Sequence, residues 1–384
     1  MAVGAPPGEV YLFVAGTRPE AVKLAPVILA LKARNRATIL VATGQHRQLF
    51  DTALAGFGLT PERDLDIMRN GQSPADVVGA LIPRLAAEID RCRPAVVIVQ
   101  GDTATAFAGA IAASYAGVPL AHVEAGLRSG ARDPFPEEMH RRAIAQLADM
   151  HFAPTQAAAA ALRREGVDAA SIAVTGNSGI DALHHMQARL AQTPGIAAAL
   201  SKRFAGINRS RPLVLVTVHR RENHGARLDC ILAALTALAC NAEIVLPVHP
   251  HPVIAGRIHA ALGGRPGVHL LPPLDYPDFV WLMEHATLAL TDSGGVQEEA
   301  PALGLPVLVL RDVTERREGL DSGNARLIGT DTAAILAAVH SLLGNAGAIG
   351  RMAEPAMPYG AGDAARRIAD ILEVKFGAIR QAAE

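Results

Sequence analysis

Several signature motifs of common enzyme classes are absent from this sequence of 384 residues. No Gly-Lys dipeptide occurs, which excludes the phosphate-binding loop of P-loop proteins. No GxGxxG fingerprint with a downstream acidic residue occurs, so a dinucleotide redox cofactor is unsupported, and we expect no cofactor. The GxSxG elbow of many hydrolases is missing as well.

The sequence also contains few cysteines and has almost no net charge. The 3 cysteines form no CxxC pair and no zinc spacing, which suits a reducing compartment. With 36 basic and 37 acidic residues, the formal net charge of −1 argues against nucleic-acid and membrane-surface partners. The N-terminal MAVGAPPGEV lacks the basic region and apolar core of a signal peptide, so we expect a cytoplasmic protein.

An uncharged run of near membrane-spanning length occurs at residues 103–121. It is rich in Ala and Gly, however, and Gly117 and Pro119 interrupt it. We therefore expect a buried helix followed by a buried strand, and no membrane partner.

The sequence does contain a repeated alternation of short apolar runs and Ala- or Leu-rich helical segments. The runs of the first half are VYLFVAG, ATILVATG, PAVVIVQGD, VPLAHVEAG, MHFAPT and SIAVTGN; those of the second half are PLVLVTVH, AEIVLPVH, GVHLLPP, ATLALTD, LPVLVL and the weaker ARLIGT. Strands that are apolar on both faces and alternate with helices indicate parallel sheets covered on both sides. The sequence therefore predicts the α/β class, with two Rossmann-like domains at residues 1–178 and 179–362 and a partly helical connector at 190–212.

Ligands of open parallel sheets bind at the carboxyl ends of the strands, so the polar residues that close each run are the site candidates. After the first run, GTRPEAVKLAPV places Arg18 at a helix start and Lys23 about one turn further on. Two cations beside a helix N-terminus suit a phosphate or another anion. The alternative is a capped surface helix with solvated charges.

Acidic residues close two further runs of the first half. Asp102 follows AVVIVQ, Glu124 follows VPLAHV, and DPFPEEMHRR adds Glu137 and Arg141 at a Pro-bounded helix start. A single strand-end acid usually caps a helix or pairs with a cation, whereas several together favour acid–base chemistry.

In the second half, TDSGGVQEEA at residues 291–300 combines a strand end, a glycine turn and a helix start. That arrangement directs free backbone N–H groups at an anion, although an ordinary βα connection has the same composition. The remaining polar or aromatic candidates of this half are His219, Arg220 and Glu222 in HRREN, His249 and His251 in LPVHPHP, Tyr276 and Phe279 in a loop suited to stacking a base, and Arg311, Arg316 and Arg317. The histidine spacing raises a metal site as an alternative, but no HExxH occurs and we expect no metal.

The motifs GTRPEAVKLAPV, GDTATA, HVEAGLRSG, PFPEEMHR, HRREN and TDSGGVQEEAPALGLPVLVLRDVTER follow one another in this order. Together they resemble the non-hydrolysing UDP-N-acetylglucosamine 2-epimerases. The resemblance implies a fold like that of the GT-B glycosyltransferases, with the nucleotide-sugar in the cleft between two domains and a C-terminal helix at residues 363–380 packed back on the first. It also implies a homodimer that interconverts UDP-GlcNAc and UDP-ManNAc for bacterial surface polysaccharides.

The same resemblance implies roles for individual residues. Ser293, Gly294 and Gly295 would hold the UDP phosphates, and Glu299 would hold the ribose hydroxyls. The residues implied to lie in the catalytic cleft are Arg18, Lys23, Asp102, Glu124, Glu137, Arg141 and His219. Arg18, His219 and Arg316 are placed to stabilise the departing diphosphate, while a carboxylate removes the proton on carbon 2. Which carboxylate acts as base and which as acid stays open.

Some positions depart from the family's pattern. His140 stands where Asn is usual, Arg317 where Pro follows TER, Val218 where a smaller residue precedes His219, and His251 where Asn is frequent. These differences leave a related UDP-acetamido sugar or uronate as an alternative substrate. Three further functions stay open beside epimerisation: a hydrolysing 2-epimerase, a GT-B glycosyltransferase and a non-catalytic nucleotide-sugar sensor.

Finally, the resemblance implies a second UDP-GlcNAc site that favours the closed cleft. The residues matching that site are Gln45, His46 and Gln48 in TGQHRQLF, together with Arg220 and His249. The alternative is that TGQHRQ only caps a helix.

Overall fold

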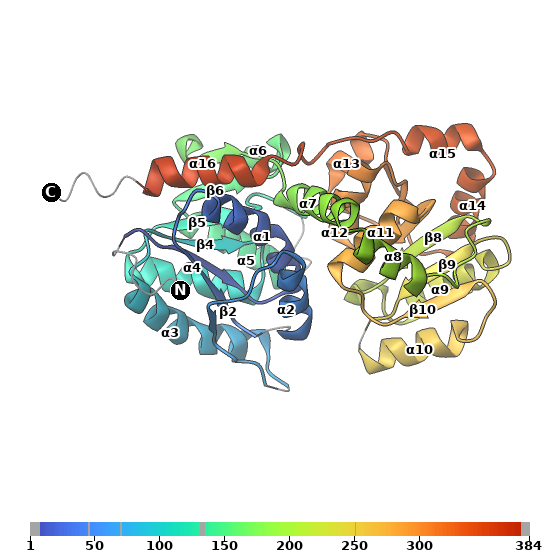
Figure 1. Ribbon diagram of the computed structural model, residues 1–384, viewed down its shortest axis with the longest axis horizontal. Coiled ribbons are helices and arrows are strands. Elements are labelled where there is room, and N and C mark those ends of the chain that lie inside the picture. The colour runs from blue at the N-terminus through green and yellow to red at the C-terminus, as the bar shows by residue number, and fades with distance from the viewer. Residues whose placement is uncertain (1–7, 45–46, 70, 131–134, 250, 378–384) are drawn as a thin grey trace. The chain divides into compact units, whose positions relative to one another are not determined.

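The structure, a computed structural model, describes residues 8–44, 47–69, 71–130, 135–249 and 251–377 (Figure 1). The chain divides into two compact units. Unit 1 comprises residues 1–185 and 359–384, and unit 2 comprises residues 186–358. Each unit is built on one parallel sheet with helices between successive strands, so the predicted α/β class is confirmed.

Unit 1 contains a seven-stranded sheet of order β3-β2-β1-β4-β5-β6-β7. Its strands are β1 (Tyr11–Ala15), β2 (Thr38–Ala42), β3 (Arg63–Asp64), β4 (Val96–Gln100), β5 (Leu120–Val123), β6 (Met150–Ala153) and β7 (Ile172–Val174). Its helices are α1 (Arg18–Lys32), α2 (Arg47–Gly56), α3 (Pro74–Cys92), α4 (Ala104–Ala116), α5 (Glu137–Leu147), α6 (Gln156–Arg164) and α16 (Ala364–Phe376), and α7 (Ser178–Gln192) begins in it.

Unit 2 contains a six-stranded sheet of order β10-β9-β8-β11-β12-β13. Its strands are β8 (Leu213–Thr217), β9 (Glu243–Pro247), β10 (Val268–Leu271), β11 (Leu288–Thr291), β12 (Val307–Val309) and β13 (Ala325–Leu327). Its helices are α8 (Pro194–Arg203), α9 (Ala226–Leu238), α10 (Pro252–Leu262), α11 (Tyr276–His285), α12 (Gly294–Glu299), α13 (Arg317–Asp321), α14 (Thr332–Leu343) and α15 (Ala346–Met352).

All twelve apolar runs predicted to be strands form strands. Most of their residues are buried, as expected where helices cover both faces of a parallel sheet. The sequence patterns did not predict β3, because this strand is only two polar residues long. It pairs with β2 through Val41–Arg63 and Ala42–Asp64. The predicted buried helix and strand at 103–121 are confirmed as α4 and β5, and the predicted connector contains α8.

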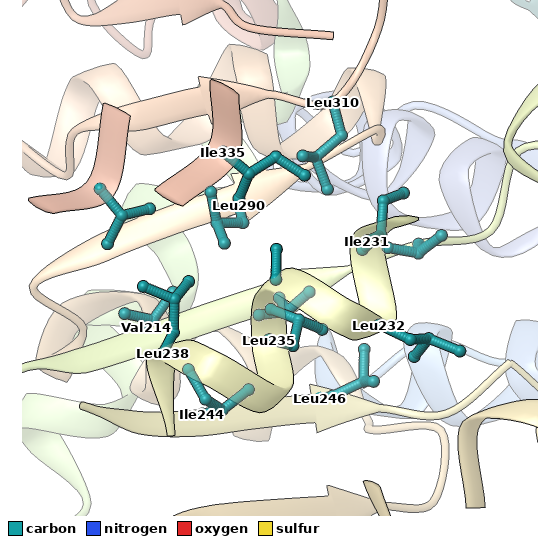
Figure 2. Close-up of a cluster of buried hydrophobic side chains, with 14 of the residues drawn as sticks. Val214, Ile231, Leu232, Leu235, Leu238, Ile244, Leu246, Leu290, Leu310 and Ile335 are labelled. Atoms are coloured by element: carbon teal, nitrogen blue, oxygen red, sulfur yellow. The ribbon is translucent and has the colours of Figure 1, made fainter. Parts of the chain in front are cut away.

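The core of unit 2 lies between its sheet and the helices that cover it. Figure 2 shows Leu235 and Leu238 of α9 in one buried cluster with Val214 of β8, Leu290 of β11 and Ile335 of α14. No single helix in the described part of the chain is long and apolar enough to cross a membrane.

Strand order fixes where ligands can approach each sheet. β1 pairs with β2 on one side and β4 on the other, and β8 lies in the same way between β9 and β11. In open parallel sheets, ligands bind at the carboxyl ends of such central strands, where the connections diverge to opposite sides of the sheet. Most of the predicted site residues follow β1, β4, β5, β8 or β11.

Candidate active site

The turn between β1 and α1 is organised by a buried carboxylate that the sequence motifs did not single out. Glu20 is 0% exposed and accepts hydrogen bonds from the backbone N–H groups of Gly16 (3.0 Å) and Thr17 (2.7 Å). Burial raises its pKa, although these hydrogen bonds oppose the shift. Arg18 begins α1 at this turn and is half-buried. Glu20 therefore fixes the backbone of the turn, and Arg18 lies at the carboxyl edge of the sheet.

Lys23 and Glu124 form a buried ion pair at the same edge. The Lys23 Nζ lies 2.6 Å from a Glu124 carboxylate oxygen, and the two side chains are only 8% and 7% exposed. The amide of Gln100 donates to the other oxygen of Glu124. Glu124 has a φ of 63°, a left-handed conformation that a non-glycine residue adopts rarely and at a cost. The structure thus places two of the predicted catalytic residues in direct contact.

Asp102 is held by a second predicted residue, Arg141. The guanidinium of Arg141 donates to the Asp102 carboxylate from Nε (3.1 Å) and from a terminal nitrogen, and it also lies 3.2 Å from Glu138. The Asp102 side chain remains 30% exposed, whereas Arg141 is 6% exposed. Glu137, half-buried in the first turn of α5, makes no hydrogen bond or ion pair with another described residue. Its carboxylate is available to a ligand.

Asp292 organises the carboxyl edge of the unit 2 sheet. It is 0% exposed and accepts hydrogen bonds from the N–H of His219 (3.0 Å), the N–H of Arg220 (2.9 Å) and the side-chain amide of Asn223 (3.0 Å). The Nδ1 of His219 lies 2.9 Å from the same carboxylate. Burial opposes ionisation, yet these bonds and the attraction of His219 hold the pKa of Asp292 below its usual value. Asp292 thereby orients the His219 ring, while the side chain of His219 stays 45% exposed.

A chain of alternating charges continues from Asp292 toward α13. Glu315 is buried and pairs with Arg220 (3.2 Å), Arg311 (2.9 Å) and Arg316. Arg316 also lies 2.8 Å from Glu298, which is buried as well. Burial opposes the ionisation of Glu315, but the three guanidiniums hold its pKa well below the ordinary range. The network therefore fixes the guanidiniums of Arg220 and Arg316.

The glycine turn after β11 lies against the guanidinium of Arg316. A Cβ built on Gly294 would lie 2.7 Å from the Nε of Arg316, so only glycine leaves room for that guanidinium. A Cβ on Gly295 would meet nothing closer than the Ser293 Oγ at 3.8 Å. Ser293 precedes α12 and its hydroxyl makes no hydrogen bond to another described residue. The predicted phosphate-binding turn and Arg316 are therefore neighbours.

The predicted base-stacking loop is wrong in its secondary structure. Tyr276 and Phe279 lie in the first turn of α11, where Pro277 suits the helix start. Tyr276 is buried, and its hydroxyl donates a 3.3 Å hydrogen bond to Glu299. Phe279 is half-buried. Tyr276 thus orients the carboxylate predicted to hold the ribose.

The remaining histidines and the predicted regulatory residues are spread over both units. Gln45 and His46 lie outside the described residues, and Gln48 is exposed in α2. His249 is half-buried after β9, and His251 is exposed. Within the described ranges, no three His, Cys, Asp or Glu side chains are grouped to hold a metal ion. The second nucleotide-sugar site stays a prediction.

Sequence reasoning missed three buried carboxylates that hold the site together, Glu20, Asp292 and Glu315. Asp292 directly follows β11, whereas Glu20 lies in the first turn of α1 and Glu315 lies in the segment between β12 and α13. The available signal for Asp292 and Glu315 was their place inside the long motif of the second half.

Comparisons with known proteins agree with this geometry. The family model described as UDP-N-acetylglucosamine 2-epimerase matches residues 29–373. A UDP-N-acetylglucosamine 2-epimerase of Yersinia pestis is 42% identical over 367 residues, which cover 94% of this chain and 98% of that protein. The crystal structure of the Neisseria meningitidis UDP-GlcNAc 2-epimerase bound to UDP-GlcNAc is similar with a TM-score of 0.91 and 38% identity, covering 95% of this chain and 99% of that one. The Methanocaldococcus jannaschii enzyme in complex with UDP-GlcNAc and UDP has a TM-score of 0.83 and 31% identity, covering 95% and 99%.

Proposed function

Because the chain belongs to the UDP-N-acetylglucosamine 2-epimerase family, we propose that it interconverts UDP-GlcNAc and UDP-ManNAc without releasing a free sugar. The observation that carries the proposal is the carboxyl edge of the unit 1 sheet. There Glu124 forms an ion pair with Lys23, and Asp102 forms one with Arg141. Glu137 lies on α5, the helix that also carries Arg141. Fixed carboxylates are the groups that a proton transfer at carbon requires.

The chemistry divides into elimination and re-addition. A carboxylate removes the proton from carbon 2, the bond from carbon 1 to the UDP oxygen breaks, and its electrons leave with UDP. A double bond then joins carbons 1 and 2. UDP adds back to carbon 1 while a carboxylic acid protonates carbon 2 on the opposite face. Asp102, Glu124 and Glu137 are the candidates for base and acid, and the assignment between them stays open.

Unit 2 supplies the groups that suit the nucleotide. In the proposal, Ser293 and the Gly294–Gly295 backbone bind the diphosphate, with Arg316 and His219 stabilising its charge as it departs. Glu299 accepts the ribose hydroxyls and is oriented by Tyr276.

Incubation of UDP-GlcNAc with the enzyme in heavy water, followed by NMR, tests the reaction. We expect UDP-ManNAc and UDP-GlcNAc that both carry deuterium at carbon 2. Free ManNAc with UDP would instead identify a hydrolysing epimerase, and an unchanged substrate would favour an acceptor-dependent glycosyltransferase or a sensor. Epimerised product that retains its original hydrogen would exclude the elimination mechanism.

The two candidate substrates are separated by the same assay. UDP-GlcNAc and a UDP-diacetamido-uronate are compared at equal concentration, and we expect turnover of the former. Arg317, the cation that motivated the uronate as a candidate, is exposed at the start of α13. Its replacement by Pro, the residue usual in the family, should leave the kcat for UDP-GlcNAc unchanged. A role in the synthesis of surface polysaccharides would follow from the product.

A further inference from the structure

The β4–α4 turn is held by two histidines at consecutive peptide groups. The Nε2 of His122, on β5, lies 2.7 Å from the carbonyl oxygen of Gly101. The Nδ1 of His140, on α5, lies 2.8 Å from the carbonyl oxygen of Asp102. Two different elements therefore hold the two carbonyls on either side of the Asp102 Cα.

The acceptors determine where each ring carries its proton. A carbonyl oxygen can only accept, so Nε2 of His122 and Nδ1 of His140 must be the protonated nitrogens. His122 is 0% exposed, and its Nδ1 has no hydrogen-bond partner among the described residues. Burial lowers the pKa of His122 to about 3, so the ring is neutral and donates through Nε2.

The same turn is held at a third point, and His140 is itself held. The hydroxyl of Thr103 donates to Glu20 of α1 at 2.6 Å. His140 is 3% exposed, and its ring stacks on Phe107 of α4, with centroids 4.7 Å apart and planes at 18°. Three successive residues of one turn are thus fixed from β5, α5 and α1.

We propose that His122 and His140 are positioning residues for Asp102, an inference that rests on the catalytic role of Asp102 in the proposed function. Arg141 fixes the Asp102 carboxylate, whereas the two histidines fix the backbone from which it projects. Displacing a catalytic group by about 1 Å can cost about 10²-fold in rate, so the backbone hydrogen bonds contribute to kcat and not to folding alone.

Asn and Gln distinguish this role from simple packing. The side-chain nitrogen of Asn is as many bonds from Cβ as Nδ1 of histidine, and that of Gln as many as Nε2. His140→Asn and His122→Gln therefore keep the donor where the carbonyl needs it. His140→Gln and His122→Asn move the donor while retaining an amide.

The test is the steady-state kinetics of these four variants, with their thermal midpoints measured alongside. We expect His140→Asn and His122→Gln to stay within about threefold of the wild-type kcat, and His140→Gln and His122→Asn to lose about tenfold or more with little change in KM. Equal losses for Asn and Gln at each position, or losses confined to KM, would overturn the proposal. If a His122 variant does not fold, the His140 pair decides.

A double-mutant cycle separates this inference from the proposed function. Asp102→Asn alone should lower kcat, and adding His140→Gln to it should cost nothing more, because the histidine acts through Asp102. A further full loss in the double variant contradicts the positioning role. An Asp102→Asn enzyme with wild-type kcat would instead show that the proposed catalytic role of Asp102 is wrong.

Discussion

The ammonium of Lys23 and the carboxylate of Glu124 meet at 2.6 Å although 101 residues separate them in the chain. Both side chains are more than nine-tenths buried, and Glu124 adopts a left-handed backbone conformation. A buried ion pair with a strained member is poorly explained by stability, since its desolvation offsets most of its attraction. It is the kind of arrangement that proteins retain for chemistry.

Glu124→Gln is the direct test of that interpretation. We expect kcat to fall by on the order of 10²-fold or more, the usual contribution of general acid–base catalysis, with KM little changed. The change also leaves the Lys23 ammonium without its carboxylate, so stability should fall. The double variant Lys23→Met, Glu124→Gln removes that buried charge and should recover stability but not activity. A Glu124→Gln enzyme with intact kcat would show that this residue is not catalytic.

Gly294→Ala should weaken UDP binding. The added methyl group overlaps the guanidinium of Arg316, which must leave its place above the turn. We expect about a tenfold rise in the Kd for UDP, measured by calorimetry, which corresponds to about 1.4 kcal/mol. Gly350→Ala, on α15 of the same unit, is the control, because its added methyl group would meet nothing within 4 Å and should leave binding within about twofold. Equal effects at both positions would show that Arg316 is not the cause.

Asp181→Ala should destabilise the docking of the C-terminal helix. The Asp181 carboxylate, on α7, accepts hydrogen bonds from the N–H groups of Ala364 (3.2 Å) and Ala365 (2.9 Å) at the start of α16. Loss of a helix cap costs about 1 kcal/mol, so the thermal midpoint should fall by a few degrees. Asp363→Ala is the control: Asp363 occupies the N-cap position but its side chain makes no capping bond, so the variant should lose less. The reverse order would contradict this assignment of the cap.

His122 should make the protein less stable as the pH falls. The folded protein protonates His122 only near pH 3, whereas an ordinary histidine does so near 6.5. Between these values the unfolded chain binds a proton that the folded chain does not, so the free energy of unfolding falls by up to about 1.4 kcal/mol per pH unit. Denaturant unfolding at pH 7, 6 and 5 should show a shallower decline for His122→Gln than for wild type. His340→Gln, at an exposed position, should keep the wild-type decline, and parallel curves for all three would contradict the prediction.

The class of fold, and the sheet edges at which the polar site candidates gather, could be predicted from the order of apolar runs and motifs along the chain. Strands buried on both faces are continuous apolar runs, so the apolar pattern predicted twelve strands, and among the described residues only the two-residue β3 was missed. The residues that close those runs then had to lie at the carboxyl edges of the sheets, which is where the structure has Lys23, Asp102, Glu124 and His219.

The partner of each of these side chains could not be predicted, because it depends on how the elements pack. Position along the chain would assign Asp363 as the cap of α16, but the carboxylate that caps it comes from Asp181, 183 residues away from the first N–H it accepts. Likewise, Asp102 is fixed by residues from β5 and α5 that nothing local connects to it. Partners of this kind depend on strand order and helix packing, and these are set by the burial of whole elements, not by the spacing of residues along the chain.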